Sequence, residues 1–372
     1  MATPFYYPTI GGTESIVENI AICLNRIGVQ TDIMTLNPAW QPSWRRRTEV
    51  INGLRIMRIP ALYLKPKILH HNKISFMIDY LPGDFKALLK YYDIIHFHND
   101  VNLCFPFFSY SITKPKIFHC HCLNMTYQLY KRNFVSRYLF AKTAGMYVAV
   151  SNWLAGLLQN LDIPSHRIRV VHNGIDIAKF HPQSGIKSSD TVLFVGRITP
   201  VKGLLTVLKS LCYLKKHIDL VVIGPMYDSQ YAKKITESAR TVAAKTGHSI
   251  TFIGVQTQEE LIRWYQKASI LVLPSLSEPF GIVGLEALSC ETPVVASSVG
   301  GIPEFVQNEK NGMLVPPGDP IKMAEGIQYL LDNERIRVSL GEEGRRSVMA
   351  KFSSEKMTKK LLHLYEEIVC DH

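Results

Sequence analysis

Two acidic residues, Glu278 and Glu286, flank a Pro-Phe-Gly turn that follows the apolar run Ile270–Pro274. Parallel sheets bind ligands at this end of a strand. Pro279 keeps the preceding residue extended and suits the first turn of a helix, which would leave backbone N–H groups free. These groups belong to Phe280, Gly281 and Ile282. The segment therefore predicts an anion site.

The same segment indicates a phosphorylated ligand that also carries hydroxyls. Glycine at position 281 removes the Cβ that would keep a diphosphate away from the backbone. A phosphate repels a neighbouring carboxylate, so we expect Glu278 and Glu286 to bind hydroxyls, such as those of a sugar or a ribose. The structural alternative is that Glu286 is an exposed helix residue and Glu278 a loop acid.

Two cations occupy a second predicted strand-to-helix turn, Gly196–Gly203. Arg197 offers a planar fork of donors and Lys202 a mobile point charge, a pair suited to neutralising a diphosphate whose charge grows as it leaves. Such a pair would make Mg²⁺ unnecessary, and we expect no metal and no cofactor. The alternative is that both are solvated surface residues.

The N-terminal half adds a glycine pair and four histidines. Gly11 and Gly12 stand at the mouth of a predicted helix, where backbone N–H groups can face an anion or a substrate can approach closely. The histidines lie at the ends of two neighbouring predicted strands, and they are His96, His98, His119 and His121.

Zinc is one interpretation of these histidines. Side chains alternate faces along a strand, so His119 and His121 point one way while Cys120 and Cys122 point the other. Those four residues cannot all bind one metal. A structural zinc site, a satisfied core or surface histidine, and a substrate-facing histidine remain as alternatives.

Short apolar runs alternate with helical segments along the whole chain, which predicts parallel sheets covered by helices. A length of 372 residues suits two such α/β domains. We place them at residues 1–180 and 188–350, with the linker between them in residues 177–190. The expected strands are Thr31–Leu36, Leu54–Ile59, Asp93–His98, Lys116–Cys122, Tyr147–Val150 and Ile168–Val171, then Thr191–Gly196, Leu220–Gly224, Ile250–Gly254, Ile270–Pro274, Pro293–Ala296 and Met313–Val315.

Composition narrows the functional classes. The apolar runs are too short to cross a bilayer, and the first residues have neither the basic nor the apolar region of a secretion signal. Seven cysteines do not form a disulfide framework. We therefore expect a cytoplasmic protein, and we expect no nucleic-acid partner.

The net charge of +11 lies entirely in the N-terminal half. Residues 1–187 carry 21 Lys+Arg against 10 Asp+Glu, whereas residues 188–372 carry 21 of each. The densest basic part, Trp44–Lys73, also contains apolar and aromatic residues, a combination that suits an anionic membrane surface or an anionic acceptor. The alternative is a solvated basic face.

These motifs together resemble the large retaining GT-B glycosyltransferases of the family 4, or group 1, type, which include bacterial phosphatidylinositol mannosyltransferases and sucrose synthases. The matching features run in the family's order across nearly the whole chain. They are Pro8–Gly12, His121, Asn173–Asp176, Gly196–Arg197 with Lys202–Gly203, Glu278–Glu286 and Gly300–Glu304. One departure is that the family's first strand normally stands before Phe5, where this chain has only a few residues.

The resemblance implies an α/β fold with two Rossmann-like, doubly wound parallel-sheet domains facing across a cleft. A last helix, residues 354–372, would cross back to the N-terminal domain. Glu278 would touch the donor sugar and Glu286 the nucleotide ribose, while Arg197 and Lys202 would hold the diphosphate. His121 would lie near the reacting centre. The donor would also meet Gly11, Gly12, Phe280, Gly281, Ile282 and Val283.

The implied function is metal-independent, retaining transfer of a sugar, a hexosyl group, from a nucleotide-diphosphate-sugar to an acceptor. The acceptor would be a glycan or a lipid-linked molecule, and the enzyme would be peripheral at the cytoplasmic membrane face. Two rival interpretations are an inactive GT-B scaffold that binds a nucleotide-sugar or a partner, and a nucleotide-sugar epimerase.

Overall fold

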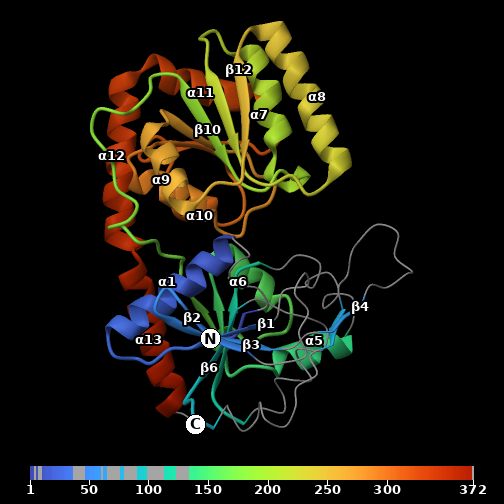
Figure 1. The fold of residues 1–372 in the computed structure, drawn as a ribbon, viewed down its shortest axis with the longest axis vertical. Helices are drawn as coiled ribbons and strands as arrows, with labels where there is room; N and C mark the ends of the chain where they lie inside the picture. Colours follow the sequence, from blue (N-terminus) through green and yellow to red (C-terminus); the bar gives the residue numbers. More distant parts are fainter. Residues whose placement is uncertain are drawn as a thin grey trace. The chain divides into compact units, whose positions relative to one another are not determined.

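The computed structural model describes residues 1–3, 6, 11–36, 47–59, 62–64, 76–78, 90–98, 113–122 and 134–370. The chain forms two compact units. Unit 1 contains Met1–Asn173 together with Ser354–His372, and unit 2 contains Gly174–Ser353. Figure 1 shows an α/β arrangement in each unit.

The sheet of unit 2 has six parallel strands in the order β12-β11-β10-β13-β14-β15. This is the strand order of a doubly wound Rossmann sheet. All six strands predicted in the second half are confirmed. They are β10 (Thr191–Val195), β11 (Asp219–Ile223), β12 (Ser249–Gly254), β13 (Ile270–Leu273), β14 (Val294–Ser297) and β15 (Gly312–Val315).

Helices cover both faces of this sheet (Figure 1). One layer consists of α7 (Leu204–Ser210), which packs between α8 (Ser229–Thr246) and α11 (Pro320–Asp332). The other consists of α10 (Ile282–Ser289), which packs against α9 (Gln258–Lys267) and α12 (Glu334–Lys351). Because both faces are covered, the central strands are apolar runs: β13 and β14 are buried along their whole length.

Unit 1 contains a three-stranded and a four-stranded sheet section that share one short bridge. The first section has the order β1-β3-β2, and the second has the order β6-β7-β8-β9. Ala2 pairs in parallel with Met34 on one side and with Phe97 on the other. Ala2 therefore lies between β1 and β6, at the position where a doubly wound domain has its first strand. The strands are β1 (Ile33–Leu36), β2 (Arg47–Ile51), β3 (Leu54–Ile59), β6 (Ile95–His98), β7 (Lys116–Cys120), β8 (Met146–Ala149) and β9 (Ile168–Val170).

The expectation of an entirely parallel first half is wrong at β2. This strand pairs antiparallel with β3 through a hairpin whose turn is Asn52-Gly53. Both turn residues have positive φ, 53° and 76°, as a tight two-residue hairpin turn requires. A further short pair, β4 (Leu62–Leu64) with β5 (Phe76–Ile78), is also antiparallel.

The described helices of unit 1 are α1 (Gly12–Arg26), α5 (Phe134–Ala141), α6 (Asn152–Gln159) and α13 (Ser354–Cys370). Four 3-10 turns complete the described elements of the two units: Ser165–Arg167 in unit 1, and Pro200–Lys202, Leu211–Tyr213 and Ile302–Glu304 in unit 2. The last helix belongs to unit 1: α13 packs against α1, and its Glu367 pairs with Arg169 of β9. Across the described part of the chain, none of the helices combines the length and the apolar character needed to span a bilayer.

Candidate functional site

The structure brings Lys202 and Glu278 into direct contact. Lys202 Nζ donates a hydrogen bond to Glu278 Oε2 over 2.6 Å, and Ser275 Oγ donates to the same oxygen over 3.0 Å. Glu278 is 6 % exposed, so its charge is held in the protein by a cation and a hydroxyl. A buried carboxylate that is this well paired is a strong, localised acceptor for hydrogen bonds.

The two loops meet because β10 and β13 are neighbours in the sheet. Leu276 N donates to Val201 O over 2.8 Å, which ties the loop after β13 to the loop after β10. Gly203 makes this approach possible, since a Cβ there would lie 1.9 Å from the carbonyl oxygen of Pro274. The site therefore lies at the carboxyl ends of parallel strands, where α/β sheets bind ligands.

The helix after Pro279 begins later than predicted. α10 starts at Ile282 and its N-cap, Gly281, has a left-handed φ of 96°. Phe280 does not offer a helical N–H group, and its ring is buried against Phe305. The first-turn N–H groups of α10 are therefore those of Ile282 and Val283.

Gly281 is a glycine for a reason other than the one predicted. A Cβ at this position would point into the protein, 3.2 Å from Leu273 Cδ2 and 3.3 Å from Glu278 Cγ. Its left-handed backbone alone also favours glycine. The residue thus shapes the turn that sets Glu278 in place.

Glu286 lies one turn into α10, half-buried, and its carboxylate has a partner that the sequence analysis did not name. Tyr265 Oη, from α9, donates to Glu286 Oε2 over 2.7 Å. Burial raises the pKa of Glu286 from 4.5 to about 7, and the Tyr265 hydrogen bond lowers it only in part. Glu286 therefore changes charge near neutral pH, unlike an exposed helix acid.

The remaining cation of the predicted site, Arg197, follows β10 and is exposed. In unit 1, Gly11 caps the start of α1 in an extended conformation and Gly12 is its first residue, so the predicted helix mouth is where the sequence places it. Residues 7–10, which precede this pair, lie outside the described residues, as do residues 44–46, 60–61 and 65–73 of the basic segment.

All four histidines are buried and lie together in unit 1. His98 Nδ1 and His121 Nε2 share a hydrogen bond of 3.0 Å, and His96 Nδ1 shares one of 2.6 Å with the hydroxyl of Tyr365 on α13. Neighbouring rings are stacked or tilted at centroid distances between 4.1 and 5.3 Å. His121 is thus oriented by His98, a residue on the adjacent strand.

Two partners in the site went unpredicted, Ser275 and Tyr265. Ser275 stands three residues before Glu278 in the same loop, and this short spacing is a signal that could have identified it. Tyr265 lies 21 residues before Glu286, and only the packing of α9 against α10 brings the two together.

Comparison with known proteins covers both units. The Glycosyltransferase Family 4 description matches residues 10–179, and Glycosyl transferases group 1 matches residues 176–347. An uncharacterized glycosyltransferase of Methanocaldococcus jannaschii is 27 % identical over 98 % of this chain and 97 % of its own. A D-inositol 3-phosphate glycosyltransferase of Corynebacterium jeikeium is 28 % identical over 96 % and 92 %.

Solved structures share the fold. Sucrose-phosphate synthase from Thermosynechococcus elongatus superposes with a TM-score of 0.80 at 22 % identity, over 100 % of this chain and 99 % of the other. The Anabaena protein HepE, solved with UDP and glucose, has a TM-score of 0.79 at 16 % identity, over 98 % of both chains. With Rossmann-like sheets in both units and the two family matches joined end to end, this chain is a glycosyltransferase of GT-B fold that belongs to the group 1, family 4 type.

Proposed function

We propose that this enzyme transfers a sugar from a nucleotide-diphosphate-sugar bound by unit 2 to an acceptor bound by unit 1, with retention of the anomeric configuration. The observation that carries the proposal is the Lys202–Glu278 pair, because it places a cation and a buried carboxylate together at the ligand-binding edge of the unit 2 sheet.

The donor's parts match the groups at this edge. The N–H groups of Ile282 and Val283 and the charges of Arg197 and Lys202 suit a diphosphate. A bound diphosphate competes with Glu278 for Lys202 and frees carboxylate capacity for sugar hydroxyls. HepE, a protein of the same fold, has been solved with UDP-glucose, which supports a donor of this chemical class.

We assign no nucleophile to the protein in this step. The bond from the anomeric carbon to the diphosphate breaks, and the acceptor oxygen bonds to the same face of the sugar. A donor phosphate oxygen takes the acceptor's proton. The two cations stabilise the leaving diphosphate, so the step needs no Mg²⁺ at that position. In unit 1, His121 and the Gly11-Gly12 turn are the groups we assign to the reacting centre.

A donor panel tests this proposal. The purified chain is incubated with UDP-, GDP- and ADP-sugars and with acceptors that include phosphoinositides, and released nucleotide and glycosylated product are measured by mass spectrometry. We expect one nucleotide to be released in step with product. Binding of a nucleotide-sugar without any release would favour the inactive scaffold, and sugar interconversion without release would favour the epimerase.

Nucleotide affinity should depend on pH through Glu286. Ribose hydroxyls donate to the ionised carboxylate, so binding favours loss of the proton that Glu286 holds with a pKa of about 7. We expect UDP affinity to rise about tenfold from pH 6 to pH 8, measured by calorimetry. The phosphate of UDP itself titrates with a pKa near 6, so the result is the difference between the wild type and Glu286→Gln.

The same carboxylate should make the stability of the folded chain change with pH in the opposite direction to UDP affinity. Because the pKa of Glu286 in the folded chain lies above its ordinary 4.5, the folded state holds the proton more tightly than the unfolded state. The free energy of unfolding should therefore decrease between about pH 4.5 and pH 7.

For the binding experiment, a pH dependence of UDP affinity that is identical in the wild type and Glu286→Gln would remove the assignment of Glu286 to the ribose.

The proposed acceptor is anionic and lipid-linked, and one surface of unit 1 supports this. No Asp or Glu occurs between Asp100 and Asp162, while the same stretch contains six Lys and Arg. Within it, α5 exposes three apolar side chains, Phe134, Val135 and Tyr138, which are 68, 62 and 55 % exposed. Apolar rings beside basic residues suit the interface of an anionic membrane.

Liposome binding tests the membrane partner. Phe134→Ser with Tyr138→Ser should lower binding to vesicles of phosphatidylcholine and phosphatidylserine by about tenfold or more, since two ring insertions are lost. Tyr213→Ser with Tyr227→Ser is the matched control, because these side chains are 54 and 77 % exposed on unit 2, whose residues 174–353 carry 20 Lys+Arg against 18 Asp+Glu. Equal binding to neutral vesicles, or an equal loss in the control, would contradict the proposal.

A further inference from the structure

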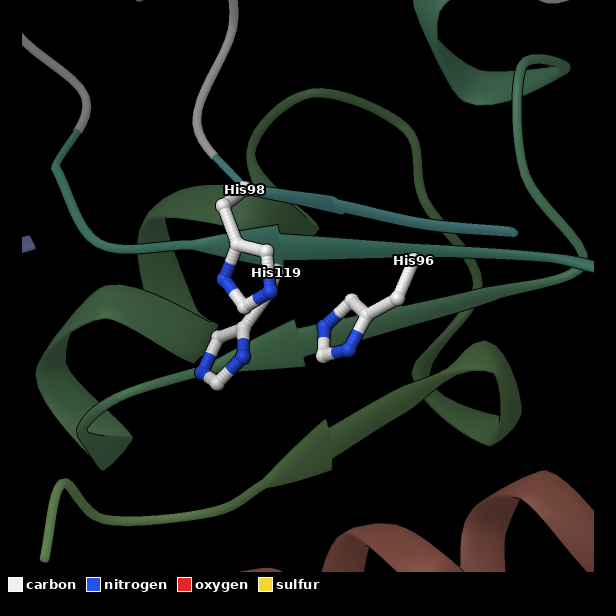
Figure 2. A group of neighbouring side chains, drawn as sticks. All are labelled: His96, His98 and His119. Atoms are coloured by element: carbon white, nitrogen blue, oxygen red, sulfur yellow. The ribbon is translucent and has the colours of Figure 1, made fainter. Parts of the chain in front are cut away.

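His96, His98 and His119 of unit 1 form a compact group on one face of two adjacent strands. His96 and His98 are two residues apart on β6, so their side chains lie on the same face of the sheet. His119 lies on β7 and pairs in register with His98. Figure 2 shows the three rings gathered on the same side of the sheet. One ring nitrogen from each of these histidines lies within 4.8 Å of the other two.

This group is buried and its hydrogen bonding is incomplete. His119 is 0 %, His98 0 % and His96 2 % exposed. Within the described part of the chain, Nε2 of His96, Nε2 of His98 and both ring nitrogens of His119 have no hydrogen-bond partner. A buried polar atom without a partner costs about 1–3 kcal/mol, so an arrangement with several such atoms on one face calls for a ligand that they share.

The state of the rings favours a metal ion as that ligand. Burial lowers the pKa of His96, His98 and His119 well below the ordinary value of 6.5, so all three are neutral at neutral pH. Neutral imidazole is the metal-binding form of histidine, and a buried neutral site binds a cation without first losing protons.

We propose that His96, His98 and His119 bind one late first-row transition-metal ion of the Zn²⁺ class, each through one ring nitrogen. Each nitrogen has to move inward by less than about 1 Å to reach the metal–nitrogen distance of about 2.1 Å. Three protein ligands leave the fourth position of a tetrahedral ion for water or hydroxide. Imidazole ligands select Zn²⁺, Cu²⁺, Ni²⁺ or Fe²⁺ over Mg²⁺ and Ca²⁺.

The surrounding bonds suit an outer shell. Tyr365 Oη holds Nδ1 of His96 and His121 Nε2 holds Nδ1 of His98, which leaves Nε2 of both rings for the ion. Metal-bound histidines commonly use their second nitrogen in this way, and the bond fixes the tautomer and the orientation of the ring. The site would therefore connect an ion to His121 through His98. It belongs to unit 1, whereas the Lys202–Glu278 pair belongs to unit 2.

The corresponding expectation from the sequence was that no metal is bound. Strand alternation correctly separates the cysteines from the histidines, yet it also places His96, His98, His119 and His121 together on one face. The metal proposal rests on these residues alone and is independent of the donor proposal.

Metal titration of the full chain tests the site. The protein is treated with a chelator and then titrated with Zn²⁺ against a chromophoric competitor, and with Co²⁺, whose visible absorption reports tetrahedral nitrogen coordination. We expect one equivalent to bind with a Kd below about 1 µM. His119→Asn should weaken Zn²⁺ binding by more than about 100-fold, because loss of an outer-shell partner alone costs 10–100-fold.

His248→Asn is the matched control, since this histidine is also buried but lies in unit 2 and bonds Leu211 O. It should bind Zn²⁺ like the wild type. Circular dichroism and thermal unfolding in chelator check that each variant is folded, and the wild-type titration stands on its own if His119→Asn does not fold. Uptake of less than one equivalent by the wild type, or equal affinity in folded His119→Asn, would overturn the proposal.

Discussion

Glu278→Gln should lower kcat/KM for sugar transfer by about ten- to a thousandfold, the range expected when one charge-assisted contact at a reacting centre is lost. Glutamine keeps the shape of the side chain but removes the charge that Lys202 and Ser275 hold in place over 2.6 and 3.0 Å. The substitution also leaves Lys202 without its acid, so donor affinity should change less than the rate. Initial-rate kinetics over a donor concentration series separates the two effects.

Glu237→Gln is the control for this measurement. It makes the same chemical change on an exposed position of α8 in the same unit, and we expect activity equal to the wild type. Thermal unfolding of both variants checks that a lower rate reflects the site and not the fold. Full activity in folded Glu278→Gln would remove that residue from the reacting centre.

The fold of unit 2 could be predicted from the sequence because its strands are short and its central strands, β10, β13 and β14, are apolar and buried along their whole length. Such runs are distinct from the amphipathic helices between them, and Thr257 with Glu260 forms a complete capping box at the start of α9. Each strand thus has a clear pattern and a clear boundary, so the local and the tertiary preferences agree.

Unit 1 departs from prediction at a short antiparallel hairpin, which a local turn signal specifies. The Asn52-Gly53 dipeptide is by itself a strong hairpin signal, and the apolar run Leu54–Ile59 follows it directly. The alternation of apolar runs and helices along the rest of the chain predicts parallel pairing and gives no sign of this hairpin. At Pro279 the error has another cause. Proline is compatible with a first helical turn, but the left-handed Gly281 is the N-cap, so the helix begins only at Ile282.

The candidate site was predictable in its residue types but not in its pairings. Spacing places Glu278 and Glu286 around a helix start, but it cannot show that Lys202 bonds one of them and Tyr265 the other. Those contacts depend on β10 lying beside β13 and on α9 packing against α10. The raised pKa of Glu286 follows from the same packing, since burial is its largest cause.

Gly300→Ala should destabilise the chain by about 3 kcal/mol or more and lower transfer activity by about 100-fold, because small displacements at a reacting centre have effects of this size. A Cβ at Gly300 would lie 1.8 Å from the carbonyl oxygen of Glu278, a position that no side-chain rotation can relieve. The same carbonyl accepts a hydrogen bond from Gly301 N over 3.0 Å. The added methyl group must therefore displace the backbone that carries Glu278.

Gly247→Ala separates this collision from backbone strain. Gly247 ends α8 with a φ of 75°, similar in sign to the 57° of Gly300, but a Cβ there has no atom within 4 Å. Its substitution should cost about 1 kcal/mol through strain alone and leave activity unchanged. Chemical denaturation and transfer kinetics on both variants give the comparison. An equal loss of stability and activity in Gly300→Ala and Gly247→Ala would contradict this account. It would mean that the close packing of residue 300 against the Glu278 carbonyl does not hold the Glu278 backbone in place.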